Sequence, residues 1–346
     1  MRSPKDFFRP LAVGAPDPVR EIPFRPSRMI HFFPLNEDGR QGPEMRTVDV
    51  LLANLGRGPC GRQGGGPGRA VEVSQGRHGR HPVLDQGPLL DSPWGLDDLV
   101  TAVTEVGEAL DVVMIPKVEG PEDIRYVDRL LAQPRRRSAR EPLLVRHPGT
   151  RGVGNVEEIC AASPRMQGLS LGPADLAANR RMKTTRVGGG HPGYVVRKDP
   201  DPEDPDAPRP TYQQDLWHYT IARMVDACRA NDVLPYYGPF GDIKDTTACE
   251  DQFRNAYLLG CVGAWSLHPV QIAIAKKVFS PDPADVAHAQ RVIEAMGDGT
   301  GALMLDGKME DDASVKQCQV MVQLAHALAD GDPELAAAYG FETRGG

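Results

Sequence analysis

The chain changes from a predicted strand to a predicted helix within the stretch GLSLGPADLAAN, residues 168–179. The apolar run at 168–171 is typical of a buried strand. Asp175 then opens the next helix, because a carboxylate in a first helical turn faces the positive end of the helix dipole. Such a strand-to-helix turn is the repeating unit of a parallel α/β fold, so the same alternation is expected on both sides of it.

Short strands and helices do alternate in the rest of the chain. Strands are predicted at 48–53, 112–115, 143–145, 168–171, 233–237 and 262–267, and helices at 97–110, from Pro121, at 156–162, 175–179, 212–230 and 249–259. Alternation over about 250 residues is typical of a (β/α)8 TIM-type barrel, which is the fold that we expect. Two further helices, at 283–296 and 313–328, predict a C-terminal helical extension.

The expected organisation has three parts. Residues 1–27 are rich in proline and form an N-terminal arm, 28–282 form the barrel, and 283–346 form the helical extension that carries the motif DGKMED. Residues 197–210 are acidic and rich in proline, so they are interpreted as an exposed loop between a strand and its helix. The triple glycine at 188–190 lacks the Lys-Ser/Thr pair of a phosphate-binding loop and is interpreted as a flexible loop at the barrel rim.

The composition excludes several classes of protein. With 346 residues and a net charge of −7, the chain is long enough for a barrel and too acidic for a general nucleic-acid binder. No apolar run approaches the roughly 18 residues of a membrane span, and the N-terminus has no apolar secretory core. Six cysteines are scattered without a C-x-x-C pair, which indicates free thiols, no structural zinc and a cytoplasmic location.

Polar side chains follow predicted strands at four places, where the catalytic rim of a barrel lies. They are Lys117 with Glu119, Asp175, Asp242 and His268. Asp175 stands among small residues, so its carboxylate could bind Mg²⁺ together with water and an oxygen-rich substrate. Alternatively it only caps its helix, and His268 could equally be a hydrogen-bonded residue at a strand end. The spacing leaves these alternatives open.

A serine hydrolase is a weaker interpretation. Residues 168–172 match G-x-S-x-G, and Asp242 and His268 follow Ser170 in the order of that triad. The hydrolase motif needs its serine at the strand-to-helix turn, whereas Ser170 lies within the predicted strand. The basic run at 135–140 is short and isolated, so it is interpreted as a solvated surface and not as a nucleic-acid site.

Several long segments together resemble one family of enzymes. They are VVMIPKVEGPEDI (112–124), the segment 163–194 around LSLGPADLAANRRMK, LPYYGPFGDIKD (234–245), LGCVGAWSLHPVQIAIAKKVFSP (259–281) and DGKMEDDAS (306–314). The chain resembles the HpcH/HpaI aldolase and citrate lyase β-subunit family, and within it the malyl-CoA lyases. The resemblance covers about two thirds of the chain.

The resemblance implies a reaction, a cofactor and partners. It implies a TIM-type barrel that uses Mg²⁺ or Mn²⁺ to cleave a 3-hydroxyacyl-CoA such as malyl-CoA, reversibly, into acetyl-CoA and glyoxylate. It also implies a homo-oligomer, commonly a trimer or hexamer. Related lyases of citramalyl-, methylmalyl- or citryl-CoA are the alternative, as is an inactive CoA-binding homologue.

The resemblance also assigns roles to individual residues. It makes Asp175 a metal ligand and Asp311 the acid/base carboxylate, which in many relatives reaches the site of a neighbouring subunit. Substrate and CoA contacts are assigned to Arg28, Lys117, Gly172, Ala174, His268 and Pro269.

Two blocks depart from the family pattern. Residues 56–89 and 134–150 are rich in Gly, Arg, Pro and His, and they begin and end sharply against well-matched sequence. An acidic turn, a substrate-binding Arg and the second metal ligand, a Glu, are missing there; Glu119 or Glu141 could replace the Glu. We interpret both blocks as products of a shifted reading frame, with true divergence of two loops as the alternative.

Overall fold

A computed structural model describes residues 27–33, 49–54, 83–86, 95–101, 110–132, 143–147, 150–184, 187–297 and 301–341. The chain divides into two compact units, each of which is described by itself. The first contains the described residues from Met29 to Ala275. The second contains those from Lys276 onward, together with Ser27 and Arg28.

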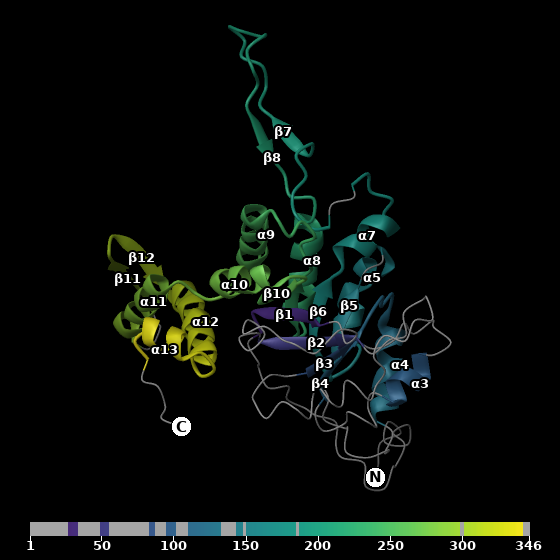
Figure 1. Ribbon diagram of the computed structural model, residues 1–346. Coiled ribbons are helices and arrows are strands. Elements are labelled where there is room, and N and C mark those ends of the chain that lie inside the picture. The colour runs from purple at the N-terminus through teal and green to yellow at the C-terminus, as the bar shows by residue number, and fades with distance from the viewer. Residues whose placement is uncertain are drawn as a thin grey trace, which may run out of the picture. The chain divides into compact units, whose positions relative to one another are not determined.

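Eight parallel strands close the first unit into a barrel (Figure 1). They are β1 (Met29–Phe33), β2 (Val50–Asn54), β3 (Val83–Gln86), β4 (Leu110–Ile115), β5 (Leu143–His147), β6 (Met166–Leu171), β9 (Leu234–Tyr237) and β10 (Gly263–Ser266). Around the barrel the order is β1-β10-β9-β6-β5-β4-β3-β2, and each neighbouring pair is parallel. The predicted TIM-type barrel is confirmed.

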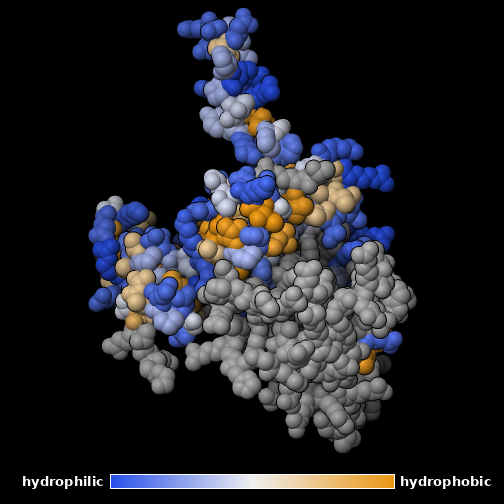
Figure 2. Space-filling view, viewed as in Figure 1, coloured by the Kyte–Doolittle hydropathy of each residue, from blue (hydrophilic) through white to orange (hydrophobic). Residues whose placement is uncertain are grey.

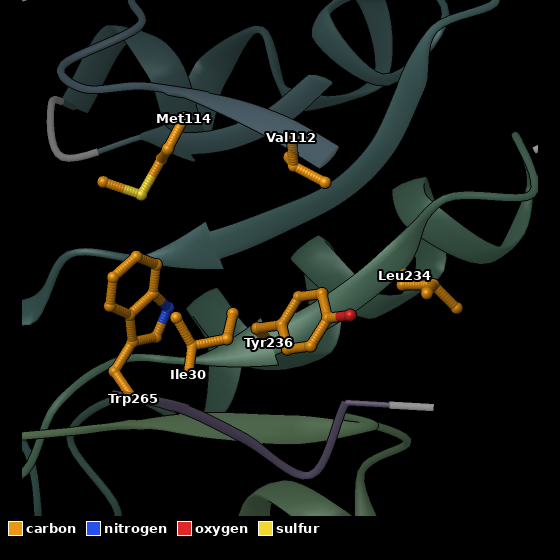
Figure 3. Packing of buried hydrophobic residues seen from close by; sticks show 6 residues of the cluster. All are labelled: Ile30, Val112, Met114, Leu234, Tyr236 and Trp265. Carbon is orange, nitrogen blue, oxygen red and sulfur yellow. The ribbon is translucent and has the colours of Figure 1, made fainter. Parts of the chain in front are cut away.

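Side chains from strands on different sides of the barrel fill its interior. The cluster consists of Ile30, Val112, Met114, Leu234, Tyr236 and Trp265, and Figure 3 shows the β4 pair facing the others. Val112 and Met114 are two residues apart, as are Leu234 and Tyr236, because alternate side chains of a strand share one face. Burying each such side chain contributes roughly 1.5–3 kcal/mol, so this cluster is a main source of barrel stability.

Helices follow the strands, and their starts are marked in the sequence. They are α3 (Gly95–Thr101), α4 (Pro121–Ala132), α5 (Thr150–Gly154), α6 (Val156–Cys160), α7 (Pro173–Asn179), α8 (His218–Arg229), α9 (Thr246–Leu258) and α10 (Pro269–Val278). Three of them begin at a proline, which loses no hydrogen bond at that position. The N-cap Asp245 accepts a hydrogen bond from the N–H of Ala248 at 2.9 Å, which fixes the start of α9.

The second unit is a small helical unit with one two-stranded ribbon. Its elements are α11 (Pro283–Met296), β11 (Ala302–Leu305), β12 (Lys308–Asp311), α12 (Asp312–Ala329) and α13 (Pro333–Ala338). One apolar cluster joins Val292 and Met296 of α11 to Val315 of α12. Asp282 and Asp311 accept hydrogen bonds from the first free N–H groups of α11 and α12, so each long helix has a side-chain cap.

A second ribbon projects from the barrel unit (Figure 1). It pairs β7 (Val195–Arg197) with β8 (Thr211–Gln213) in antiparallel register. The prediction of one helix over 212–230 was therefore wrong at its start, because the backbone of 211–213 pairs with β7 and α8 begins only at His218. The acidic segment 197–210 is exposed and lies between β6 and α8, as expected, but it forms the end of this ribbon and not a plain loop.

Other strand predictions need correction. No strand was predicted within the Gly- and Arg-rich block 56–89, yet Val83–Gln86 supplies β3 of the barrel wall. The predicted helix 97–110 is too long, because Leu110 begins β4. The sequence pattern also missed β1. These strands are only four to six residues long, which is too short for a hydrophobic period to be distinctive.

Several expectations lie outside the described residues. The N-terminal arm at 1–27 is described only at Ser27, and the two unusual blocks only at Val83–Gln86, Leu143–His147 and Thr150. Glu141, the 135–140 basic run and Cys60 also lie outside. Within the described part of the chain, the cysteines are free thiols, and no helix is long and apolar enough to cross a membrane.

Candidate active site at the barrel rim

The carboxyl ends of parallel strands meet at one edge of a barrel, so residues that follow the strands gather there. Lys117 follows β4, Asp175 follows β6, Asp242 follows β9 and His268 follows β10. The last three of these strands are direct neighbours in the barrel wall. The structure therefore brings the predicted rim residues to the same edge.

The turn between β6 and α7 presents Asp175 to solvent. Gly172 is the N-cap residue, and its carbonyl accepts a hydrogen bond from the N–H of Leu176 at 3.0 Å. Pro173 and Leu176 are buried, whereas Ala174 and Asp175 are exposed. Within the described residues the Asp175 carboxylate makes no hydrogen bond or ion pair. Because Gly172 occupies the cap position, Asp175 is not the capping residue, and its oxygens are available to a cation.

The rim at β9 packs closely on this turn. A Cβ atom added to Gly238 would lie 2.3 Å from the carbonyl oxygen of Leu171 and 2.4 Å from Cδ of Pro173. Real Cβ atoms do not approach other atoms so closely, so only glycine permits this spacing. The end of β9 therefore supports the turn that carries Asp175.

The triple glycine at 188–190 forms a second packed contact at the rim. Gly188 and Gly189 are buried and have φ angles of 73° and 76°, a region that favours glycine. The hydroxyl of Tyr237 accepts a hydrogen bond from the N–H of Gly189 at 3.1 Å, and the carbonyl of Val187 accepts one from Gly241 at 2.8 Å. The expectation of a flexible loop was wrong, because these bonds hold the run against the residues that follow β9.

Gln271 links two rim segments, and the sequence analysis missed it. Its Nε2 donates to the carbonyl of Phe240 at 2.8 Å, and its Oε1 accepts from the N–H of Leu267 at 2.9 Å. The side chain is 1% exposed. It thereby fixes the turn of His268 and Pro269 relative to the segment after β9. The available signal was a lone amide in the otherwise apolar run PVQIAIA at 269–275.

A buried histidine, also missed, joins the first and last strands of the barrel. His31 in β1 and Ser266 in β10 lie in register, and Nδ1 of His31 is 2.5 Å from the hydroxyl of Ser266. Burial, and next the nearby His268, lower the pKa of His31 to about 4. His31 is therefore neutral at pH 7. His268 itself is exposed, and its Nδ1 accepts from the N–H of Val270 at 3.3 Å.

Lys117 and Glu119 occupy the loop after β4. Lys117 is exposed and has a φ angle of 54°, an uncommon value for a residue with a side chain. Glu119 lies 3.8 Å from a guanidinium nitrogen of Arg151, so its carboxylate already has a cationic partner. Among the described residues no group of three or more His, Cys, Asp or Glu side chains could enclose a metal ion. Asp175 thus offers a single open carboxylate.

Two further predicted site residues belong to the second unit. Arg28 is buried; its guanidinium donates to Asp332 at 3.2 Å and to Ser280 at 3.1 Å. Asp311 caps α12, accepting hydrogen bonds from the N–H groups of Ala313 and Ser314 at 3.0 Å. These bonds, with that from Ser314 the strongest, lower the pKa of the Asp311 carboxyl. The roles of both residues toward a substrate remain predictions.

Ser170 is unsuited to be a nucleophile. It lies inside β6 in register with Tyr236 of the barrel interior, and its side chain is 0% exposed. No described group accepts or donates a hydrogen bond to its hydroxyl, so no base activates it. The buried position argues against the hydrolase interpretation.

Comparisons with known proteins agree with this arrangement. The HpcH/HpaI aldolase/citrate lyase family matches residues 87–269. A malyl-CoA/β-methylmalyl-CoA/citramalyl-CoA lyase from Chloroflexus aurantiacus is 53% identical over 97% of this chain and 98% of its own length. An L-malyl-CoA/β-methylmalyl-CoA lyase from Cereibacter sphaeroides is 38% identical over 69% of this chain and 75% of its own.

Solved structures show the same fold at lower identity. A citrate lyase from Burkholderia xenovorans superposes with a TM-score of 0.63 at 18% identity, covering 91% of this chain and 96% of its own. The protein CitE from Mycobacterium tuberculosis, in complex with magnesium, acetoacetate and coenzyme A, has a TM-score of 0.60 at 20% identity, covering 86% and 97%. On the family match and the full-length similarity, the chain belongs to the HpcH/HpaI aldolase/citrate lyase family.

Proposed function

We propose that the chain is a Mg²⁺-dependent carbon–carbon lyase that cleaves malyl-CoA reversibly to acetyl-CoA and glyoxylate. The observation that carries the proposal is the open carboxylate of Asp175 at the barrel rim, in a chain 53% identical to a lyase named for malyl-, β-methylmalyl- and citramalyl-CoA. Because that relative is named for three CoA esters, β-methylmalyl-CoA and citramalyl-CoA are further candidate substrates.

Asp175 is the residue that would hold the metal. Mg²⁺ takes one or two carboxylates, several waters and substrate oxygens, and an exposed carboxylate without a described protein partner fits that set. When bound, Mg²⁺ or Mn²⁺ supplies Lewis-acid stabilisation of negative charge on substrate oxygen. The backbone at Gly172 and Ala174 would orient the carboxylate of the glyoxylate half. The buried side chains of Pro173 and Leu176 hold this backbone turn in place.

Asp311 would move the proton of the reaction. In cleavage the substrate hydroxyl would pass its proton to the Asp311 carboxylate, the bond between the two halves breaks, and the electron pair remains on the thioester half as an enolate, to which Asp311 returns the proton. That enolate takes a proton at carbon and becomes acetyl-CoA. In the condensing direction the Asp311 carboxylate removes the same proton from the acetyl methyl group. Its lowered pKa keeps it ionised for this step.

The remaining predicted residues would bind the CoA ester. Lys117 and His268 stand exposed at the rim, and Pro269 begins α10 directly after His268. Arg28 is already paired with Asp332, so a substrate role for it requires that this ion pair be shared. We further propose that the chain forms a homo-oligomer and that it is located in the cytoplasm.

A condensation assay tests the proposed reaction. Purified full-length chain is given acetyl-CoA, glyoxylate and Mg²⁺, and the CoA esters are separated by chromatography. We expect malyl-CoA to form, a chelator to stop its formation, and added Mg²⁺ to restore it. Hydrolysis of the thioester at a rate that the chelator does not change would favour a hydrolase. Binding of acetyl-CoA without any condensation would identify an inactive homologue and overturn the proposal.

We also propose that residues 56–89 and 134–150 arise from a shifted reading frame. The support is their composition and the absence of the acidic residue expected at 145–152. Sequencing the encoding DNA across codons 50–92 and 130–153 tests this. Small insertions or deletions whose correction supplies the missing Arg and Glu are expected. An unchanged sequence would mean that the two segments have truly diverged, and it would favour the inactive CoA-binding homologue, because among the described residues Asp175 is an open carboxylate outside any group of three possible metal ligands.

A further inference from the structure

The turn between β10 and α10 combines apolar and polar groups at the rim of the barrel. Leu267 and Val270 are 40% and 38% exposed, and His268 between them is exposed as well. Figure 2 shows hydrophobic residues gathered at the surface in the region of α9 and α10. A site with apolar walls and a few polar groups suits a ligand of mixed character. A CoA ester is such a ligand, because its pantetheine chain alternates methylene groups with amides.

A buried hydrogen bond holds the start of this turn. Ser266, the last residue of β10, is 0% exposed, and His31 of β1 is 5% exposed. The two are register partners, and Nδ1 of His31 lies 2.5 Å from the Ser266 hydroxyl. Ile30 and Trp265, one residue earlier on each strand, belong to the interior cluster, so His31 and Ser266 face the outer side of the barrel wall. The bond therefore ties β1 to β10 directly before the turn.

A second buried side chain holds the other end of the turn. Gln271 accepts a hydrogen bond from the N–H of Leu267 at 2.9 Å and donates one to the carbonyl of Phe240 at 2.8 Å. Ser266 and Gln271 thus anchor the backbone on both sides of His268 and Pro269. Buried anchors of this kind keep a binding element in one geometry, which lowers the entropy lost when a ligand binds.

His31 also lies close to His268. Burial, and next the charge of His268, lower the pKa of His31 to about 4. The His31 ring is therefore neutral at pH 7, and a neutral imidazole carries one donor and one acceptor nitrogen. It bonds to Ser266 without placing a second positive charge beside the exposed imidazole of His268.

We propose that His31 is a positioning residue for the CoA ester, an inference that rests on the proposed function. His31 fixes the Ser266 hydroxyl, and Ser266 in turn places the backbone at His268 and Pro269, which contacts the ester. Asp175 follows a different strand, β6. A displaced turn should therefore weaken binding of the ester more than it slows cleavage of the carbon–carbon bond.

Substitutions on both sides of the bond test the inference. His31→Leu and Ser266→Ala each remove the bond, whereas His31→Asn keeps a polar atom near the position of Nδ1. Calorimetric titration of the full-length chain with acetyl-CoA in the presence of Mg²⁺ gives the Kd, and circular dichroism verifies folding. We expect each removal to raise this Kd about fivefold or more, the equivalent of one net hydrogen bond. His31→Asn should bind nearly as wild type does, and so should the matched control His218→Leu at an exposed position of α8.

The double variant separates positioning from a simple loss of contacts. If His31 acts through Ser266, His31→Leu combined with Ser266→Ala should bind acetyl-CoA no more weakly than the weaker single variant, because coupled residues are not additive. In cleavage assays the same variants should raise KM for malyl-CoA more than they lower kcat. Wild-type Kd values in both single variants, additive losses in the double variant, or no rescue by His31→Asn would overturn the inference.

The titration also distinguishes this inference from the proposed function, because it needs no turnover. A wild type that cleaves malyl-CoA, together with variants that bind as tightly as wild type, would overturn the role of His31 alone. A wild type that binds acetyl-CoA without any cleavage, together with the expected loss in the variants, would overturn the proposed reaction and support the positioning of the CoA ester by His31.

Discussion

Gln271 shows how one buried amide controls the spacing of the rim. It donates to the carbonyl of Phe240 and accepts from the N–H of Leu267, so it ties the segment after β9 to the turn of His268. Both partners are backbone groups. Losing the amide would leave buried polar groups unpaired, which costs more than the bonds themselves contribute.

Gln271→Leu should therefore lower stability and activity together. The expected loss is about 1–3 kcal/mol for each unpaired buried group, measured by urea unfolding. Gln319→Leu, at an exposed site on α12, makes the same chemical change and should have an effect within about 0.5 kcal/mol. If both variants unfold at the same urea concentration as wild type, Gln271 does not hold the rim.

His31 predicts a pH dependence of stability. Its pKa is about 4 when folded, lowered by burial and by His268, against 6.5 as the ordinary value. Between these values the unfolded chain binds the proton more readily than the folded one. The contribution of neutral His31 is complete above pH 6.5 and falls as the pH drops toward 4.

Nuclear magnetic resonance titration of the His31 ring checks the value directly, with exposed His218 in the same spectrum as the internal control. A His31 titration midpoint near 6.5 would contradict the buried pair of His31 with Ser266.

Neither His31 nor Gln271 could be selected from the sequence. A single polar residue in an apolar run gives the same pattern whether or not the fold provides it with a hydrogen-bond partner. Asp175 was found because it follows a strand, stands among small residues and begins a helix.

At the scale of elements, the approach of β9 to the start of α7 positions Asp175. Gly238→Ala would place a methyl group 2.3 Å from the Leu171 carbonyl oxygen. We expect a loss of about 1–3 kcal/mol in stability and a shifted α7. Gly154→Ala is the matched control, since a Cβ atom there meets nothing within 4 Å. Thermal melting should show Gly238→Ala destabilised and Gly154→Ala unchanged or more stable; the reverse order would refute the close packing.

The start of α12 separates the capping role of Asp311 from its proposed chemical role. Asn is a good N-cap, so Asp311→Asn should keep the melting temperature near that of wild type. The same variant should lower turnover roughly 10²- to 10⁴-fold, because an amide cannot accept the proton. Asp282→Ala removes the equivalent cap of α11 and should lower the melting temperature without a comparable loss of turnover. Full turnover by Asp311→Asn would remove the assignment.

Helices and strands could be predicted where the residues of the element and its immediate neighbours in sequence determine its structure. The strands at 233–237 and 262–267 were expected close to where β9 and β10 lie, because short β-branched or aromatic runs stand between clear helices. β3 was not, since its residues Val83–Gln86 follow a Gly- and Arg-rich stretch and become a strand only by pairing with β2 and β4. Tyr212 was assigned to a helix because its partner strand lies 16 residues away.

At the scale of the whole molecule, the barrel could be predicted from the alternation of short strands and helices along the sequence. The projecting ribbon of β7 and β8 could not. Eight strands in one closed parallel order place the ends of β4, β6, β9 and β10 on one rim, so the general position of the site was predictable. The projecting ribbon has no counterpart in the repeating pattern. Its acidic composition indicated exposure, and only backbone pairing shows that it is structured.

The central claim is that Asp175 at this rim supports metal-dependent cleavage of a CoA ester. The most direct measurement compares kcat/KM for malyl-CoA cleavage with Mg²⁺ in wild type, Asp175→Asn and Asp251→Asn, the last at an exposed carboxylate on α9. We predict that Asp175→Asn lowers kcat/KM at least about 100-fold and that Asp251→Asn does not change it. Cleavage by Asp175→Asn at the wild-type rate would contradict the account.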